Sequence, residues 1–267
     1  MQYLYSSPAK VNLFLNILGK REDGYHDIQS IFQLIDLKDE IIFKKRNGGR
    51  INLSCNHKTL EEDNIIIKAI DLYSQLSGID NIGLDILLKK NIPIGRGLGG
   101  GSSNAATTLL ALNEIYDHKV KLTSLYKASL SIGSDVPFFL HAKNSWVEGK
   151  GDIITNIFLK PRWFIMIFGK HNVSTIDIYS LLEIIENPLS YSYDDYMNNN
   201  FKNDFEDIVF QKYPSIKKSY DILSNFGNAR MSGTGGTIFI SFDTLKSAKA
   251  ILSLIPKNQK AVLIPSL

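Results

Sequence analysis

Apolar and polar residues alternate with period two along the first part of the chain. Between residues 8 and 19, one face of the pattern holds Val11, Leu13, Leu15 and Ile17, and the opposite face holds Lys10, Asn12, Phe14 and Asn16. Alternation of this kind places successive side chains on opposite faces of a strand. The pattern therefore predicts a first strand, and the runs at 28–45, 50–55 and 82–90 predict further strands of an antiparallel or mixed sheet.

Helical spacing replaces the alternation elsewhere. Residues 62–78 read as a helix that stops at its terminal glycine, and residues 105–116 show helical spacing with Ser102 or Ser103 as the N-cap. The second half of the chain predicts strands at 160–169 and 237–242 and helices at 215–227 and 245–255. This mixed order predicts an α+β protein with two domains, residues 1–155 and 156–267.

Composition narrows the class of protein. A hydrophobic share of 44% and a charged share of 21% are typical of a soluble globular protein. The formal net charge of +3 is too small to indicate nucleic acid as a partner. The single cysteine, Cys55, excludes an internal disulfide. Since no signal-peptide pattern and no membrane-length apolar run is present, we expect a cytoplasmic protein without a membrane partner, either monomeric or homodimeric.

A glycine-rich run joins the predicted strand at 82–90 to the predicted helix at 105–116. Five of the seven residues from Gly95 to Gly101 are glycine. A strand, a glycine loop and a helix with free N-terminal amides form an anion-binding site. A tight turn between strand and helix is the alternative, but the number of glycines favours a phosphate-binding loop.

The common nucleotide-binding loops do not fit this run. Gly95, Gly97 and Gly100 satisfy the dinucleotide-binding pattern G-x-G-x-x-G, and Glu114 lies about twenty residues further on. In a dinucleotide-binding fold that acidic residue follows a second parallel strand, whereas Glu114 falls at the end of the predicted helix. The run also lacks the lysine of a Walker loop, and the chain lacks the V-A-I-K, H-R-D and D-F-G motifs of protein kinases.

The stretch PIGRGLGGGSSNAA resembles the second motif of the GHMP small-molecule kinases. Three further stretches agree with that family: PAKVNLFLNILGKREDGYHDIQSIFQLIDLKDEI near the start, GSDVPFFL at 133–140 and ARMSGTGGTIFISF at 229–242. The resemblance implies an N-terminal ATP-binding α+β domain and a ferredoxin-like C-terminal domain. The D-G-Y-H stretch is similar to members that use ATP to phosphorylate a hydroxyl of a cytidine diphosphate sugar alcohol, in the non-mevalonate isoprenoid pathway.

The resemblance implies two catalytic residues. Asp135 before V-P-F-F reads from the residues alone as a helix N-cap, and the family motif implies instead that it is the base. Lys10 is implied to stabilise charge on the transferred phosphoryl group and to tune Asp135. A plain salt bridge between the two is the alternative.

By the same resemblance, Tyr25 would stack on cytosine and His26 would hydrogen-bond to the base edge. The other implied substrate contacts are Asn12, Phe32, Tyr179 as a second aromatic, and Gly233 and Gly235 near the diphosphate. From the residues alone, Tyr25 and His26 are ordinary turn neighbours, Phe32 is a core residue, and the glycines form a turn.

The implied ATP contacts fall in and around the glycine run. The phosphates would lie on Pro93, Ile94, Gly95, Arg96, Gly97, Leu98, Gly99, Gly100, Gly101, Ser102 and Ser103, and the adenine and ribose near Asn64, Lys90 and Asn104. Arg96 stands where relatives commonly have a small residue, so it either contacts phosphate or points outward. Mg²⁺ is implied by the chemistry, with Ser102 or Ser103 as a candidate ligand, and no carboxylate cluster in the sequence names its other ligands.

Two alternatives stay open. A different GHMP kinase acting on another small alcohol would keep the glycine run and give no role to Tyr25 and His26. A nucleotide-binding module without catalysis would leave Lys10 and Asp135 without a function.

Overall fold

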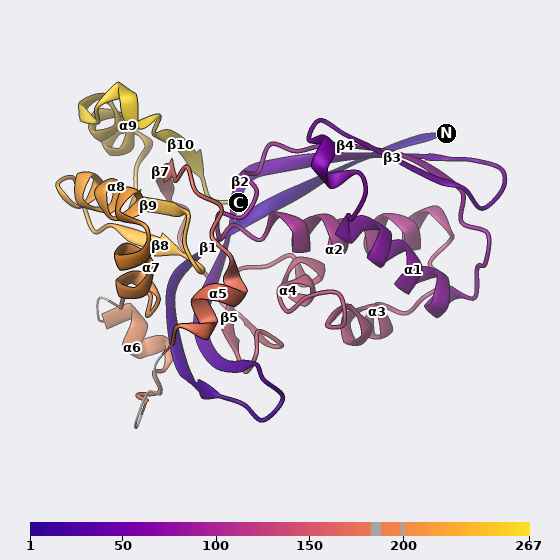
Figure 1. Cartoon of the computed structure of the whole chain (residues 1–267), viewed down its shortest axis with the longest axis horizontal. Helices are drawn as coiled ribbons and strands as arrows, with labels where there is room; N and C mark the ends of the chain where they lie inside the picture. The colour runs from indigo at the N-terminus through magenta and orange to yellow at the C-terminus, as the bar shows by residue number, and fades with distance from the viewer. Residues whose placement is uncertain (183–187, 199–200) are drawn as a thin grey trace. The chain divides into compact units, whose positions relative to one another are not determined.

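The computed structural model describes residues 1–182, 188–198 and 201–267 (Figure 1). The strands are β1 (Gln2–Lys20), β2 (His26–Lys45), β3 (Ile51–Cys55), β4 (Leu84–Lys89), β5 (Ser145–Glu148), β6 (Ile153–Asn156), β7 (Trp163–Phe168), β8 (Arg230–Ser232), β9 (Thr237–Phe242) and β10 (Val262–Pro265). The helices are α1 (Ile65–Ser77), α2 (Gly100–Ile115), α3 (Leu122–Ser129), α4 (Val136–His141), α5 (Thr175–Ser180), α6 (Tyr193–Asn198), α7 (Glu206–Lys212), α8 (Pro214–Ser224) and α9 (Leu245–Leu254). The mixed order confirms the α+β class.

The chain divides into two compact units that interleave along the sequence. The first unit contains Met1–Ala9, Leu37–Ile92 and Gly99–Ala142. The second contains Lys10–Asp36, Pro93–Leu98 and Lys143–Leu267. The chain therefore passes between the units several times, and the division at residue 155 stays a prediction about domains.

The first unit combines a small sheet with four helices. The second part of β2 pairs antiparallel with β4, and β4 pairs parallel with β3. In Figure 1, α1 to α4 lie on the same side of β3 and β4, and α2 packs against α1 and α4. The Asn64 side chain caps α1 by accepting from Ile66 N, and Gly78 ends this helix with a φ of 70°. The predicted end at Gly78 is confirmed.

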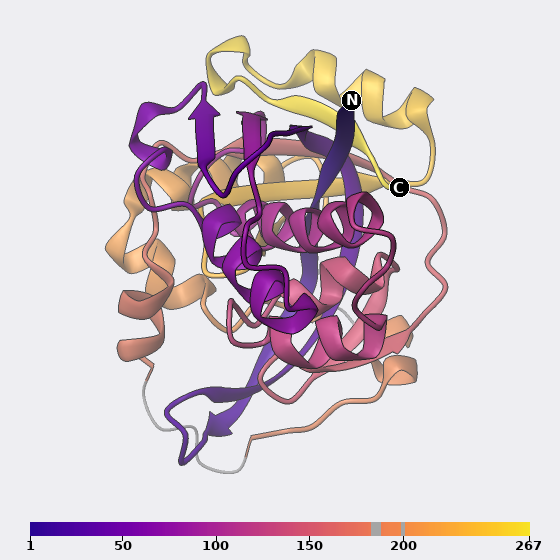
Figure 2. The ribbon, with the colours of Figure 1, turned by 90° about the vertical axis from the view of Figure 1, so that its right-hand side faces the viewer.

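The second unit contains a four-stranded antiparallel sheet, among the described residues, in the order β10-β7-β9-β8. Figure 2 shows α9 running alongside β10, and α8 packs on β9. Buried apolar side chains of the sheet and helices, including Ile165, Ile240, Phe205 and Leu223, form its core. The first part of β2 pairs with β5, which pairs with β6.

β1 is buried on both faces over residues 11–15. The alternation predicted an apolar and a polar face, and Phe14 on the second face is only 1% exposed. Its ring centroid lies 5.3 Å from that of Trp146 and 5.2 Å from that of Tyr196. Side chains from distant parts of the second unit therefore cover the face that the local pattern leaves open.

No helix in the described part of the chain is both long enough and apolar enough to span a bilayer.

Candidate active site

The glycine run forms the start of α2. The helix begins at Gly100, and Gly99 is its N-cap with a φ of 68°. The first helical hydrogen bond runs from Ser103 N to Gly99 O at 2.9 Å, so the N–H groups of Gly100, Gly101 and Ser102 precede the helical ladder. The predicted N-cap at Ser102 or Ser103 is wrong, because the glycines themselves belong to the helix. The exposed Gly101 amide and its neighbours form a positive helix end that suits an anion.

The first half of the run belongs to the second unit and packs against the other glycine-rich segment. A Cβ on Gly97 would lie 2.1 Å from Ser232 O, and the φ of Gly97 is 71°. Ser232 Oγ also donates to Gly97 O at 2.9 Å. Only glycine fits at this close approach of two backbones. The structure therefore brings residues 93–98 and 232–236 together.

Gly233 and Gly235 turn the chain between β8 and β9, with φ angles of 56° and 110°. Asn203 stabilises this turn with two hydrogen bonds: its Nδ2 donates to Met231 O at 3.0 Å and to Gly233 O at 2.7 Å. Asn203 is 2% exposed. Asn203 could not be predicted from the sequence, because it follows a polar stretch with no periodic pattern.

The Arg96 side chain is bonded to the protein backbone. Its Nε donates to Gly169 O at 2.7 Å, and one terminal nitrogen donates to Lys170 O at 3.0 Å. The other terminal nitrogen donates to Ile94 O at 3.0 Å and to Gly95 O at 3.2 Å. The guanidinium thus fastens the glycine run to the segment after β7, and a contact between Arg96 and phosphate stays a prediction.

Lys10 is a buried lysine on β1. It is 3% exposed, and its Nζ donates to Asn12 Oδ1 at 2.6 Å and lies 4.2 Å from the ring centroid of Phe32. Asn12 is held in turn by its own Nδ2, which donates to Ser30 Oγ at 3.0 Å, and by its backbone N–H, which donates to Ser232 Oγ at 3.1 Å. The structure therefore brings Lys10, Asn12 and Phe32 together beside the second glycine-rich segment.

Asp135 occupies the N-cap position of α4 in the first unit. In the described part of the chain, its side chain does not make the capping hydrogen bond to the start of α4. Asp135 is half-buried. Lys10 belongs to the second unit, so the pairing of Lys10 with Asp135 stays a prediction.

Tyr25, His26 and Tyr179 all belong to the second unit. The ring centroids of His26 and Tyr179 are 5.0 Å apart, and Tyr25 is 52% exposed with Lys150 Nζ 4.8 Å from its ring centroid. Burial, together with the charge of Lys20, lowers the pKa of His26, so its ring is neutral at pH 7. A neutral imidazole offers one donor and one acceptor. The Tyr179 ring beside a neutral imidazole suits a planar heterocycle.

The three residues predicted near adenine and ribose lie in the first unit. Asn64 caps α1, Lys90 forms a buried ion pair with Asp39, and Asn104 Nδ2 donates to Asp39 Oδ2 at 2.9 Å. Each of these side chains therefore has a partner inside the protein. Asp39, which the sequence analysis missed, is the shared partner of the last two.

The two candidate serines differ in accessibility. Ser103 is 0% exposed and its Oγ accepts from Ser7 Oγ at 2.8 Å, whereas Ser102 is half-buried. Among the described residues, no group of three or more His, Cys, Asp and Glu side chains is placed to hold a metal ion. Mg²⁺ bound with ATP takes most of its ligands from phosphates and water and one or two from protein, so a half-exposed hydroxyl such as Ser102 fits that demand better than Ser103.

Comparisons with known proteins identify the family of the chain. The family model described as "GHMP kinases N terminal domain" matches residues 64–143, and the one described as "GHMP kinases C terminal" matches residues 192–260. The chain therefore belongs to the GHMP kinases, a family of ATP-dependent small-molecule kinases, and has their two-domain fold.

Within that family, two similar relatives carry the same name. The 4-diphosphocytidyl-2-C-methyl-D-erythritol kinase of Buchnera aphidicola subsp. Schizaphis graminum is 39% identical over 98% of this chain and 92% of its own length. The enzyme of the same name from Pasteurella multocida is 36% identical over 96% of this chain and 87% of its own length.

Solved structures are similar over the whole chain. A crystal structure of 4-(cytidine 5'-diphospho)-2C-methyl-D-erythritol kinase has a TM-score of 0.80 and 27% identity, and the match covers 100% of this chain and 99% of that one. The mevalonate kinase of Methanococcus jannaschii, at 18% identity and a TM-score of 0.71 over 100% of this chain and 98% of that one, shares the fold.

Proposed function

We propose that this chain transfers the γ-phosphoryl group of ATP to the 2-hydroxyl of 4-diphosphocytidyl-2-C-methyl-D-erythritol, giving the 2-phosphate and ADP. One observation carries the choice of substrate within the GHMP kinases: the His26 ring lies 5.0 Å from the Tyr179 ring, next in sequence to the exposed Tyr25, in the unit that also holds Lys10 and Asn12. A kinase for a small aliphatic alcohol has no use for these rings. The names of the relatives support the same substrate.

The proposed roles follow from the geometry of each unit. The ATP phosphates bind the N–H groups at the start of α2, together with residues 93–98. Lys10 stabilises charge on the transferred phosphoryl group, and Asn12 fixes the Lys10 ammonium. Asp135 accepts the hydroxyl proton. Mg²⁺, when bound with ATP, neutralises phosphate charge, and Ser102 is the proposed protein ligand.

The cytidyl end of the substrate binds the aromatic group. Tyr25 stacks on cytosine and Tyr179 closes the pocket behind His26, whose neutral ring pairs with the base edge. The substrate diphosphate lies on the turn at Gly233 and Gly235, where glycine allows the backbone to approach closely. Because ATP is the phosphoryl donor, we expect a cytoplasmic enzyme.

The experiment measures ADP formation with Mg²⁺ and ATP on three alcohols: the cytidyl substrate, homoserine and mevalonate. Wild-type protein should turn over the cytidyl substrate alone. Asp135→Asn should lose at least 100-fold in kcat with little change in KM, since general base catalysis contributes roughly 10²–10⁴-fold. Asp63→Asn is the matched control, because this carboxylate is 88% exposed.

Each other outcome has one meaning. Turnover of homoserine or mevalonate would reject the cytidyl substrate and leave a GHMP kinase for another alcohol. ATP binding without turnover of any alcohol, unchanged by Asp135→Asn, would support a non-catalytic nucleotide-binding module.

A further inference from the structure

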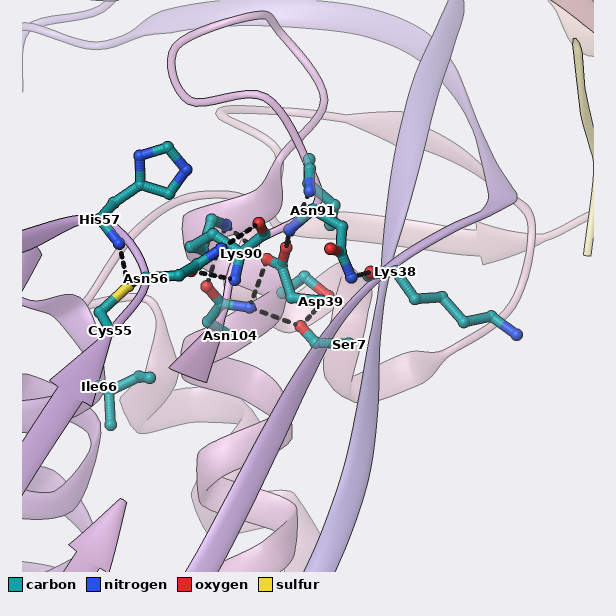
Figure 3. A network of polar contacts seen from close by, with 12 residues as sticks. Ser7, Lys38, Asp39, Cys55, Asn56, His57, Ile66, Lys90, Asn91 and Asn104 are labelled. Carbon is teal, nitrogen blue, oxygen red and sulfur yellow. Dashed lines mark hydrogen bonds and ion pairs between the residues drawn. The ribbon is translucent and has the colours of Figure 1, made fainter. Parts of the chain in front are cut away.

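A buried carboxylate lies at the centre of a polar network beside the start of α2 (Figure 3). Asp39, on β2, is 0% exposed. Its Oδ1 accepts from the backbone N–H groups of Asn91 at 2.8 Å and Ile92 at 2.9 Å. Its Oδ2 accepts from Lys90 Nζ and from Asn104 Nδ2. These four hydrogen bonds tie β2 to the segment after β4 and to α2.

The network continues along the first turns of α2. Lys90 Nζ also donates to Asn104 Oδ1 at 3.2 Å, and Asn104 Nδ2 donates to Ser7 Oγ at 2.9 Å. Ser7 Oγ donates in turn to Ser103 Oγ at 2.8 Å. All four side chains are buried. Ser103 and Asn104, two consecutive residues of α2, therefore form hydrogen bonds with residues outside the helix. They follow directly after the three residues whose N–H groups precede the helical ladder.

Charge explains why an aspartate stands at this position. A Cβ on Gly100 would lie 3.1 Å from Lys90 Nζ, so the ammonium lies against the first residue of α2. A buried cation next to the positive end of a helix is unfavourable unless an anion neutralises it. Asp39 supplies that anion, and its other oxygen fixes the backbone that leads into the glycine run.

We propose that Asp39 is a positioning residue for ATP: through Lys90 and Asn104 it sets the location of the amides at the start of α2 that receive the phosphates. The inference rests on the proposed function, specifically on phosphate binding at this helix end. Asp39 acts only through these neighbours, so its substitution should change the affinity for ATP and leave the affinity for the cytidyl substrate unchanged.

The test compares Asp39→Asn with Glu40→Gln. Glu40 is the adjacent residue of β2 and pairs with Lys89 at 3.0 Å, but its side chain is 42% exposed and that of Lys89 is 51% exposed. We expect Asp39→Asn to raise the Kd of Mg-ATP, by titration calorimetry, and the KM for ATP at least tenfold. The KM for the cytidyl substrate should stay within twofold, and Glu40→Gln should change neither constant. Circular dichroism and melting curves establish that each variant is folded at the assay temperature.

A folded Asp39→Asn protein that binds ATP as wild type does, or that loses affinity for both substrates equally, would overturn the inference. Should Asp39→Asn not fold, Ser7→Ala carries the test, because it removes one hydroxyl from the same network. It should raise the KM for ATP about threefold at unchanged kcat, and an unchanged KM would overturn the inference. Wild-type protein that binds ATP but does not turn over the cytidyl substrate would count against the proposed function alone.

Discussion

Substitution of Gly101 tests where the ATP phosphates bind. Gly101 is exposed in the first turn of α2, and a Cβ there would meet Ile65 Cγ2 at 4.0 Å, an ordinary contact. Alanine should therefore fit and stabilise the helix by about 0.5–1 kcal/mol. Aspartate should also be tolerated, because an acidic residue in the first turn of a helix is favourable by about 0.3–1 kcal/mol.

The two variants should differ in their affinity for ATP. In Gly101→Asp the new carboxylate would lie about 6 Å from a bound phosphate, and at an effective dielectric constant of about 20 two unit charges at that distance repel by about 2.8 kcal/mol. This is about a hundredfold in Kd. Gly101→Ala should bind ATP within threefold of wild type. Denaturant unfolding and titration with Mg-ATP give the two quantities separately.

The reasoning would be refuted if Gly101→Asp bound ATP within threefold of Gly101→Ala. A loss of stability in both variants would instead show that the first turn of α2 is more crowded than the structure indicates.

Two further predictions concern Arg96 and Glu206. Arg96→Lys cannot reach all of the backbone carbonyls that the guanidinium holds, so it should lower the free energy of unfolding by about 1 kcal/mol, a modest value because the side chain is half exposed. A large loss of kcat at unchanged stability would instead indicate a direct contact with phosphate. Burial raises the pKa of Glu206 above its ordinary value of 4.5, opposed by the hydrogen bond from Met231 N. The native state therefore binds more protons than the unfolded state above pH 4.5, and stability falls as pH rises through the interval up to the folded pKa. Glu206→Gln keeps an acceptor for Met231 N, so it should be more stable than wild type at pH 8 and lose that advantage at pH 4. Urea unfolding at both pH values measures the difference in free energy of unfolding between the two proteins. An equal difference at both pH values would exclude ionisation of Glu206 as the cause.

Local patterns predicted the elements well where short-range chemistry controls them. The strand at 8–19 and the helix ending at Gly78 follow from alternation and from a glycine that adopts positive φ. The start of α2 could not be predicted in this way. Helix propensity disfavours Gly100, but Lys90 and Ile92 lie so close that a Cβ on this residue would meet the Ile92 side chain at 2.9 Å. Tertiary packing, which the local pattern does not contain, requires the glycine.

Family motifs predicted more of the candidate site than the periodicity of apolar and polar residues did. Motif resemblance located Lys10, Asn12 and His26, and the structure brings Lys10 and Asn12 into direct contact. Asp39 was missed although a signal existed: it occupies the same face of β2 as Ile41 and Phe43, which are both 0% exposed. A carboxylate at an inward-facing strand position requires a partner. The identity of that partner depended on strand pairing across 51 positions of sequence.

Because the two units interleave along the chain, some native contacts of β1 can form only late in synthesis. The backbone of Asn12 donates to Ser232, a separation of 220 residues, and that of Ile17 donates to Asp204, a separation of 187 residues. Such contacts have a high loop-closure entropy and form late in folding. During synthesis on the ribosome, β1 can pair with β2 soon after both have been made, but Asp204 and Ser232 exist only after most of the chain. For most of translation, the backbone N–H groups of Asn12 and Ile17 therefore lack their native acceptors, which leaves this strand open to incorrect pairing.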